Sequence, residues 1–560
     1  MITDRKVFVK RQVMDRRLTA ALDYLFLGAI IYIVTLQPHF MHGTINFYET
    51  GIYLPQINEL FHGKALYKDI FVLRGPLEIF MPAFLMKLFG MHIGVLNAYF
   101  YYGTILTLLI YAIFARRIFS TRYFVYIFTL VLIARTFPWS CYNVWGGIRF
   151  GFGILALLLA VEYLNKNKSY WLFFAGLSSS LAFWTSIELG VFSFISIVTV
   201  LCLYGYCDKK NTGMMLKHMV VYIFGIFIAT VPFIIYLFST NAFLAYVNTM
   251  RVILTKMTRV FDPGFSFETP RNIKEFVLSF SPLNHCFKYT LPFFFYMLTS
   301  LYLIKTSLKN RALFFKSPIV GLFIYGLLFY ISAFRDIEGP QYRMAMQPLL
   351  LIMFFYLEQI YKYFYKQVVT TGGVKKALAL FFVLLIFLYP IGFSISKYCK
   401  RFFVFKDMRS LIFNKIHAPI PYADPTPTAI KTERAKGIIV PAAQAHEIDE
   451  VVEYLTLNTK DSEAVFTFPD LGTYNFLADR PCLGRFCSAE FSFIDQNWFR
   501  EMMKELKIKS PKYVIRAKDF SRLEVFRPTL GKYLDEVNMY LNKNYEVIKS
   551  YRAVDILKAE

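Results

Sequence analysis

Apolar segments recur along this chain, and they constrain its fold more than any other feature. Of the 560 residues, 56% are hydrophobic, which is more apolar surface than a soluble fold can bury. A helix needs about 20 mostly apolar residues to cross a hydrocarbon core about 30 Å thick. The candidate segments lie near 19–37, 92–114, 123–137, 148–164, 170–186, 189–206, 218–238, 289–305, 317–334, 344–361 and 377–395. We therefore predict a polytopic α-helical membrane protein with about 11 transmembrane helices.

The stretch from Pro76 to Gly90 decides the topology. A helix over these residues reaches only about 22 Å, too short to span comfortably. Leaving it out of the count places the basic N-terminus on the same side as the other basic clusters, in agreement with the positive-inside rule. We predict that it lies in the outer interface, that the N-terminus is cytoplasmic, and that everything after Lys397 is extracytoplasmic.

The net charge of +24 comes mainly from short Lys and Arg clusters at the ends of apolar runs. This pattern suits the anionic headgroups of membrane lipids. The sequence has no basic stripe with stacking aromatic residues, so we do not expect it to bind nucleic acid. The N-glycosylation sequon at Asn167 falls on the cytoplasmic side, which favours a bacterial inner membrane over an endoplasmic reticulum protein.

The C-terminal part reads as a separate soluble domain. We divide the chain into a transmembrane domain (1–395), a linker (396–430) that is rich in proline, and an extracytoplasmic α/β domain (431–560). Strands are predicted at 465–469, 513–516 and within 545–557, and helices at 446–458, 494–507 and 528–543. The domain has no phosphate loop or nucleophile elbow, so we expect it to pack over the membrane site and help choose a substrate. Cys482 and Cys487 either close a small loop or stay reduced.

The first outer loop, which follows the first span, carries two acidic candidates, Glu49 and Asp69. A short amphipathic helix (IYLPQINELFHG) lies between them, and with the segment from Pro76 it gives the loop two interfacial helices. A carboxylate held there, half out of water, can have a raised pKa and accept a proton as a general base. The alternative is that Glu49 caps a helix or pairs with a basic residue.

The run from Tyr48 to Gly90 contains E-x-G-x-Y, then G-x-x-L-Y-x-D, then G-P-L and a closing L-F-G. It resembles the first outer loop of the GT-C superfamily of glycosyltransferases, in particular the group that includes protein O-mannosyltransferases and the aminoarabinose transferase acting on lipid A. The resemblance implies a polyprenyl-phosphate-linked sugar donor, an acidic base in this loop, two juxtamembrane helices after it, and an outward C-terminal domain.

By position, Glu49 matches the acidic residue of the family, although many members have an Asp-Glu pair where this chain has Tyr48-Glu49. Asp69 sits where members often carry a second acid, which would orient the acceptor or hold a divalent ion. The segment from Trp145 to Arg149 (WGGIR) also resembles the family pattern.

A late outer loop (RDIEGPQYR) resembles the family loop whose basic residue faces the lipid phosphate. It contains Arg335, Gln341 and Arg343, and members frequently have a His near the position of Gln341.

Arginines on the outer face also suit phosphate independently of the family, because a planar guanidinium binds phosphate oxygens bidentately. The candidates are Arg149, Arg335 and Arg343, and Arg74 of the first outer loop is a further substrate-binding candidate. For each, the alternative is pairing with a nearby acid or snorkelling to headgroups. Glu188, between two spans, is a further substrate-binding candidate, and burial against an arginine is its alternative role.

We therefore expect a membrane glycosyltransferase that moves a single sugar from a polyprenyl-phosphate donor to a glycan, lipid or protein acceptor. A multi-spanning transporter and a lipid-linked polysaccharide polymerase or ligase are the alternatives. A divalent cation is compatible with the chain but not required, and His39 and His42 lack a third ligand for zinc.

Overall fold

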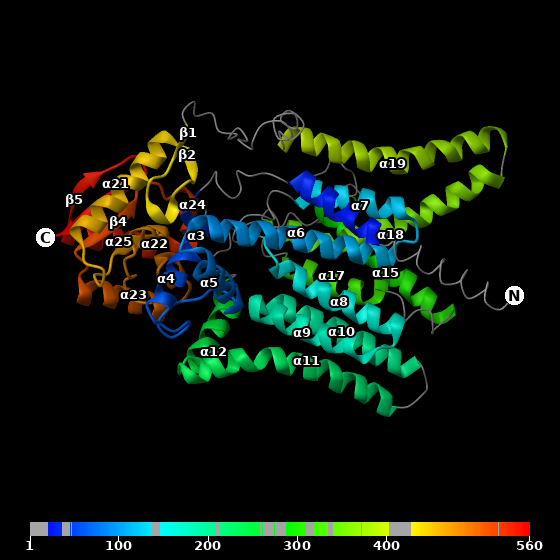
Figure 1. Ribbon diagram of the computed structural model, residues 1–560, viewed down its shortest axis with the longest axis horizontal. Helices are drawn as coiled ribbons and strands as arrows, with labels where there is room; N and C mark the ends of the chain where they lie inside the picture. The colour runs from blue at the N-terminus through cyan, green and yellow to red at the C-terminus, as the bar shows by residue number, and fades with distance from the viewer. Residues whose placement is uncertain are drawn as a thin grey trace, which may run out of the picture.

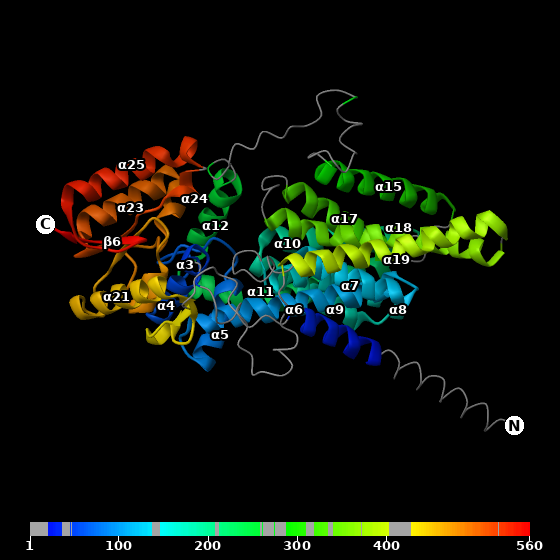
Figure 2. The same cartoon turned by 90° about the horizontal axis from the view of Figure 1, so that it is seen from above.

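The computed structural model describes residues 21–35, 45, 47–136, 146–207, 212–257, 260, 274, 287–309, 318–333, 340–370, 372–401, 427–524 and 526–560. A bundle of long helices forms one end of the molecule, and a smaller domain containing a sheet forms the other (Figure 1). Three short helices of the first outer loop lie at the junction between them, as Figure 2 also shows.

Each predicted apolar segment coincides with a helix. The bundle helices are Ala21–Thr35, α6 (Ile93–Ile118), α7 (Arg122–Thr136), α8 (Arg149–Lys166), α9 (Ser169–Thr185), α10 (Ile187–Cys207), α11 (Thr212–Ser239), α15 (Phe287–Lys309), α17 (Pro318–Ser332), α18 (Pro340–Thr370) and α19 (Gly373–Arg401). Within the described residues, six of them are long and apolar enough to cross a membrane, namely α6, α10, α11, α15, α18 and α19. The number of 11 spans stays a prediction.

The outward faces of the bundle are apolar. On α11 and α19, which lie on opposite sides of the bundle in Figure 1, large side chains such as Phe224, Phe227, Leu384 and Leu388 are exposed. A contiguous exposed apolar surface of this kind is suited to lipid rather than water.

The first outer loop folds into α3 (Phe47–Gly51), α4 (Leu54–Phe61) and α5 (Leu77–Phe89). The predicted amphipathic helix is confirmed as α4. The segment from Pro76 forms α5, whose 13 residues are too few for a comfortable span. It packs against α4, α6 and α9, so it ties the loop to the bundle.

A second outer segment reaches the C-terminal domain. It consists of α12 (Phe243–Val252) and a π-helical turn at Ile253–Met257. Lys256 forms an ion pair with Asp495, and the hydroxyl of Thr529 donates a hydrogen bond to the carbonyl of Val260 at 2.6 Å.

The C-terminal domain is built on a four-stranded sheet. The strands β3 (Phe466–Phe468), β4 (Tyr513–Ala517), β6 (Val554–Ala559) and β5 (Tyr545–Ser550) follow in this order; β3 pairs with β4 in parallel and the other pairs are antiparallel. Figure 2 shows α23 (Gln496–Lys509) and α25 (Arg527–Asn544) on one side of the sheet and α21 (Ala442–Asn458) on the other. The central strand β4 is buried on both faces accordingly.

The remaining elements are small. They are the hairpin strands β1 (Pro427–Ala429) and β2 (Ile439–Pro441), the 3-10 turns η4 (Glu433–Ala435) and η5 (Ala489–Ile494), and the helices α22 (Thr473–Ala478) and α24 (Ser521–Glu524). Cys482 and Cys487 are joined by a disulfide bond, with 5.1 Å between their Cα atoms. The predicted strands and helices of this domain are all found, while its boundary at 431 stays a prediction.

Candidate active site

A buried cluster of polar side chains joins the first outer loop to α8. Nη1 of Arg74 donates to the hydroxyl of Tyr53 at 2.5 Å and to Oε2 of Glu78 at 3.2 Å. The Tyr53 hydroxyl donates to the same Oε2 at 3.0 Å. Nε of Arg149 lies 3.5 Å from the other oxygen, Oε1. Glu78 thus contacts two of the predicted substrate-binding arginines while being only 2% exposed.

Glu78 was missed by the sequence analysis. It sits in the first turn of α5, inside an apolar stretch that draws attention to membrane contact rather than to chemistry. One signal lies in the sequence, because an acid four residues after Arg74 is near enough along the chain to form an ion pair with it. An ionisable residue in an apolar helix is also a functional candidate by default.

Backbone packing fixes the position of Arg74. The next residue, Gly75, donates its N–H to the carbonyl of Thr185 at 3.2 Å, and a side chain there would collide with the carbonyl of Trp184 at the end of α9. The hydroxyl of Tyr67 donates to the carbonyl of Arg74 at 2.5 Å. The segment therefore approaches α9 as closely as glycine permits.

Arg149 is placed by the two glycines before it. Gly147 has a φ of +85°, and a Cβ there would lie 2.9 Å from the ring of Phe100. Its N–H donates to the hydroxyl of Thr104, and its carbonyl accepts from Thr107, both at 3.0 Å. The turn therefore lies directly on α6, and α8 begins with Arg149 beside Glu78.

Glu49 lies on α3, four residues before Tyr53, and is 7% exposed. The C-terminal domain covers this helix. The hydroxyl of Thr473 donates to the carbonyl of Phe47 at 3.1 Å, and lies 2.7 Å from the hydroxyl of Thr50. Since Thr473 has one proton to donate, Thr50 is the donor in the second bond. Glu49 is therefore held on a short helix between the domain and the cluster.

The other predicted residues have different surroundings. Asp69 is exposed, and its carboxylate accepts a hydrogen bond from the N–H of Ala65 at 3.0 Å, which closes its own turn. Glu188 is half-buried in the first turn of α10, within electrostatic range of Arg149. Both acids thus lie on elements next to the cluster, but only Glu188 faces one of its members.

The late outer loop is partly described. Arg343 lies on α18, close enough to Arg135 of α7 for the two positive charges to act on each other. Gln341 belongs to the start of α18, but its side chain lies outside the described residues, as do Arg335, His39 and His42. Among the side chains that the structure describes, no group of three His, Cys, Asp or Glu is placed to hold a metal ion.

An apolar groove of about 850 Å³ runs between α5 and α6. Its walls include Met81, Leu85, Val95, Tyr99 and Ile148, and Lys436 of the C-terminal domain lies at its edge. Tyr99 is within electrostatic range of the cluster, and Ile148 directly precedes Arg149. This apolar groove therefore reaches the residue that directly precedes Arg149.

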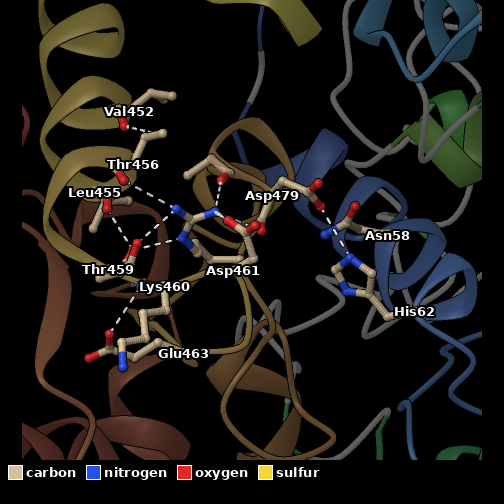
Figure 3. Close-up of polar contacts among 12 residues, drawn as sticks. Asn58, His62, Val452, Leu455, Thr456, Thr459, Lys460, Asp461, Glu463 and Asp479 are labelled. Atoms are coloured by element: carbon tan, nitrogen blue, oxygen red, sulfur yellow. Dashed lines mark hydrogen bonds and ion pairs between the residues drawn. The ribbon is translucent and has the colours of Figure 1, made fainter.

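The C-terminal domain grips α4 through polar contacts. Figure 3 shows Asn58 of α4 and His62, the residue directly after α4, facing Asp479 of the domain. Nε2 of His62 lies 3.2 Å from Asp479, and Arg434 bridges Asn58 at 2.7 Å and Asp479 at 2.8 Å. These contacts show that the C-terminal domain packs on the first outer loop, and its part in choosing a substrate stays a prediction.

No protein-family profile and no curated protein sequence matches the chain. Among the solved structures that match it, two do so over nearly its whole length and illustrate the likeness. ArnT from Cupriavidus metallidurans bound to undecaprenyl phosphate is 11% identical, with a TM-score of 0.50 over 96% of this chain and 98% of that one. The apo state of the same protein is 10% identical, with a TM-score of 0.47 over 97% and 98%. At this identity the likeness to the first structure shows the fold alone: the chain folds like ArnT over nearly its whole length.

Proposed function

We propose, from the GT-C-like fold and the buried cluster, that this chain is a membrane glycosyltransferase that moves one sugar from a polyprenyl-phosphate donor to an acceptor on the extracytoplasmic face. A lipid-linked donor is supported by the undecaprenyl phosphate bound to ArnT, the fold neighbour. The sugar is a hexose or a pentose, and the acceptor is a glycan, a lipid or a protein.

The observation that carries the proposal is the convergence of Arg74 and Arg149 on Glu78 beside an apolar groove. A guanidinium offers five N–H donors in a plane, so each arginine can hold Glu78 and a phosphate oxygen together. A phosphate attached to a long apolar chain matches this combination of a buried cationic end and an apolar groove.

Glu49 acts as the general base in this proposal. It takes the proton of the acceptor hydroxyl while the hydroxyl oxygen attacks the anomeric carbon. The bond between that carbon and the phosphate oxygen breaks, polyprenyl phosphate leaves with the bonding electrons, and the anomeric configuration is inverted. The negative charge on the leaving phosphate grows in the transition state, where the two arginines stabilise it most. Asp69, from the exposed side of the same loop, would orient the acceptor.

Glu78 holds the arginines in place rather than touching the reacting atoms. Two buried guanidinium groups repel each other and lose hydration, and a shared carboxylate offsets both costs. It also fixes the direction from which each guanidinium meets the phosphate, which matters because orientation contributes several kcal/mol to catalysis, of order 7–11 in favourable cases.

The disulfide between Cys482 and Cys487 supports an outward position of the C-terminal domain, because such bonds persist in oxidising compartments. With the basic clusters on the opposite side, this agrees with a bacterial inner membrane and a cytoplasmic N-terminus.

The donor class is tested with purified protein and a panel of isotopically labelled sugars linked to undecaprenyl phosphate, with the same sugars on nucleotide diphosphates as the comparison. We expect sugar release or transfer only from the lipid-linked donors. Use of the nucleotide donors alone would contradict the proposal.

The size of the transferred group separates the remaining alternatives. A single sugar added per turnover identifies a transferase, and an oligosaccharide moved as a block identifies a polymerase or ligase. Counterflow of free sugar in proteoliposomes, without any covalent product, would identify a transporter.

A further inference from the structure

The turn closed by Cys482 and Cys487 contacts both chain segments that build the buried cluster. It belongs to the C-terminal domain, and its two cysteines are 4% and 6% exposed. We propose that this disulfide-closed turn is a positioning element for the transfer reaction: it holds the segment that carries Tyr53 and the segment that carries Arg74 in register. The catalytic consequence of this inference rests on the proposed function. The contacts on which it is built are independent of that function.

The first contact fixes α4. The N–H of Cys482 donates to Oε1 of Glu59 at 2.7 Å, and Glu59 is 1% exposed. Glu59 also pairs with Lys64, so its charge is compensated where it is buried. Since a buried charge-assisted hydrogen bond is about twice as strong as a neutral one, it fixes the helix firmly. Tyr53 immediately precedes this helix.

The second contact fixes the segment before Arg74. The carbonyl of Arg485 accepts a hydrogen bond from the N–H of Phe71 at 2.8 Å. The ring of Phe71 packs against Phe486, inside the turn, and against Trp498, each with 5.4 Å between ring centroids. Phe71 precedes Arg74 by three residues. The turn therefore binds the same short backbone segment that carries Arg74 into the cluster.

The turn is itself anchored to the domain. Val465, just before β3, forms an isolated bridge with Cys482, and the hydroxyl of Thr467 on β3 donates to the carbonyl of Cys487 at 3.3 Å. The guanidinium of Arg485 pairs with Glu501 of α23 at 2.7 Å. Both ends and the middle of the turn are therefore fixed to elements of the folded domain.

The disulfide fixes the distance between the two contacts that the turn makes, one with Glu59 and one with Phe71. The Cys482 amide and the Arg485 carbonyl lie in one closed ring, and opening that ring gives the turn more conformations. The segments of Tyr53 and Arg74 are then free to shift relative to each other. Because a misplacement of about 1 Å can cost a hundredfold in rate, we expect the change to appear in kcat more than in donor binding.

The experiment compares the oxidised and reduced forms of the full chain in detergent or nanodiscs. A dithiol reductant gives two electrons and two protons to the S–S bond, which leaves two thiols and oxidises the reductant to its own disulfide. Alkylation and mass spectrometry report the state of the pair. The double variant Cys482→Ser/Cys487→Ser gives a permanently open turn, and Cys202→Ser, which removes a cysteine of α10 that is not in a disulfide, is the matched control.

Two readouts decide the outcome. We expect amide hydrogen exchange at Phe71 and Cys482 to become at least about tenfold faster on opening the turn, and to return on reoxidation. We also expect kcat to fall at least about tenfold while the KM for the lipid donor stays within about twofold, with Cys202→Ser like wild type. If the exchange rates and kcat both return to their original values on reoxidation, the protein has stayed folded, and the loss of activity came from misplaced segments.

Unchanged exchange at Phe71 and Cys482 in the open form would overturn the inference, and so would faster exchange with unchanged kcat. Absence of transfer by the oxidised wild type would count against the proposed function alone, because the exchange readout needs no activity.

Discussion

The guanidinium of Arg74 lies 2.5 Å from the hydroxyl of Tyr53, 21 residues earlier in the chain. That hydroxyl in turn donates to Glu78, so it accepts one hydrogen bond and makes another. Burial raises the pKa of Tyr53, which keeps its proton on the oxygen at physiological pH. The phenol therefore connects a buried cation to a buried anion without adding charge.

Tyr53→Phe tests this link, because it removes the hydroxyl and leaves the ring that packs against Phe100 at 5.1 Å. We expect a loss of stability of about 1–3 kcal/mol from the buried polar groups left without it. We also expect kcat to fall roughly tenfold, because Arg74 loses the hydroxyl that holds its guanidinium in place. Thermal unfolding and initial rates measure both. Tyr363→Phe, on an exposed part of α18, is the control, and equal behaviour of the two variants would contradict the link.

Glu78→Gln keeps the size of the side chain and removes its charge. Breaking a buried ion pair by removing one partner costs about 3–5 kcal/mol, because the remaining charge is uncompensated. We therefore expect a clear drop in unfolding temperature together with a loss of transfer. The double variant Glu78→Gln/Arg149→Gln should recover stability, since fewer cations stay unpaired, without recovering activity. Wild-type stability in the single variant would show that Glu78 does not hold the arginines.

The groove between α5 and α6 predicts a dependence on chain length. Ala98 lines it, and Ala98→Phe adds a ring to the space for the prenyl chain. We expect the KM for an undecaprenyl-phosphate sugar to rise at least about tenfold, while a donor with a short prenyl chain is less affected. Val374→Phe, on the exposed start of α19, adds the same ring outside the groove. An equal rise in KM for donors with long and short prenyl chains would show that the prenyl chain does not bind in this groove.

Acid should weaken the C-terminal sheet through Asp555. Partial burial acts to raise the pKa of Asp555, but bonds from Ser550 at 2.7 Å and from Arg516 and Lys518 at 3.3 Å hold it below its usual value. A depressed pKa stabilises the fold above the unfolded value of about 3.9, and this contribution is lost as the pH falls through the folded value. Unfolding temperature against pH should fall less steeply on the acid side in Asp555→Asn than in wild type, and parallel curves would contradict this.

Much of the architecture could be predicted because it follows from local pattern. Apolar length locates the bundle helices, short apolar runs locate β3 and β4, and alternation locates β5 and β6. The contact of that domain with α4 could not be predicted. Asp479 is far from Asn58 and His62 in the sequence, and nothing in the sequence indicates that they meet.

The site was predicted in part for the same reason. Arg149 follows from the chemistry of phosphate and Arg74 from its place in the first outer loop, and both contact Glu78 in the structure. Glu78 escaped because its role depends on a fold that joins the start of α5 to the start of α8. Arg343 lies on α18, near enough to Arg135 for their charges to act on each other, and its role as a phosphate ligand stays a prediction.

Sugar transfer by Glu49→Gln tests the central claim most directly. Wild type, Glu49→Gln and the exposed-carboxylate control Glu536→Gln are given the labelled lipid-linked donor, and both product formation and donor binding are measured. We predict that Glu49→Gln binds the donor like wild type but loses at least about a hundredfold in kcat, since a general base contributes that much, while Glu536→Gln keeps full activity. Full transfer activity in Glu49→Gln would contradict the account.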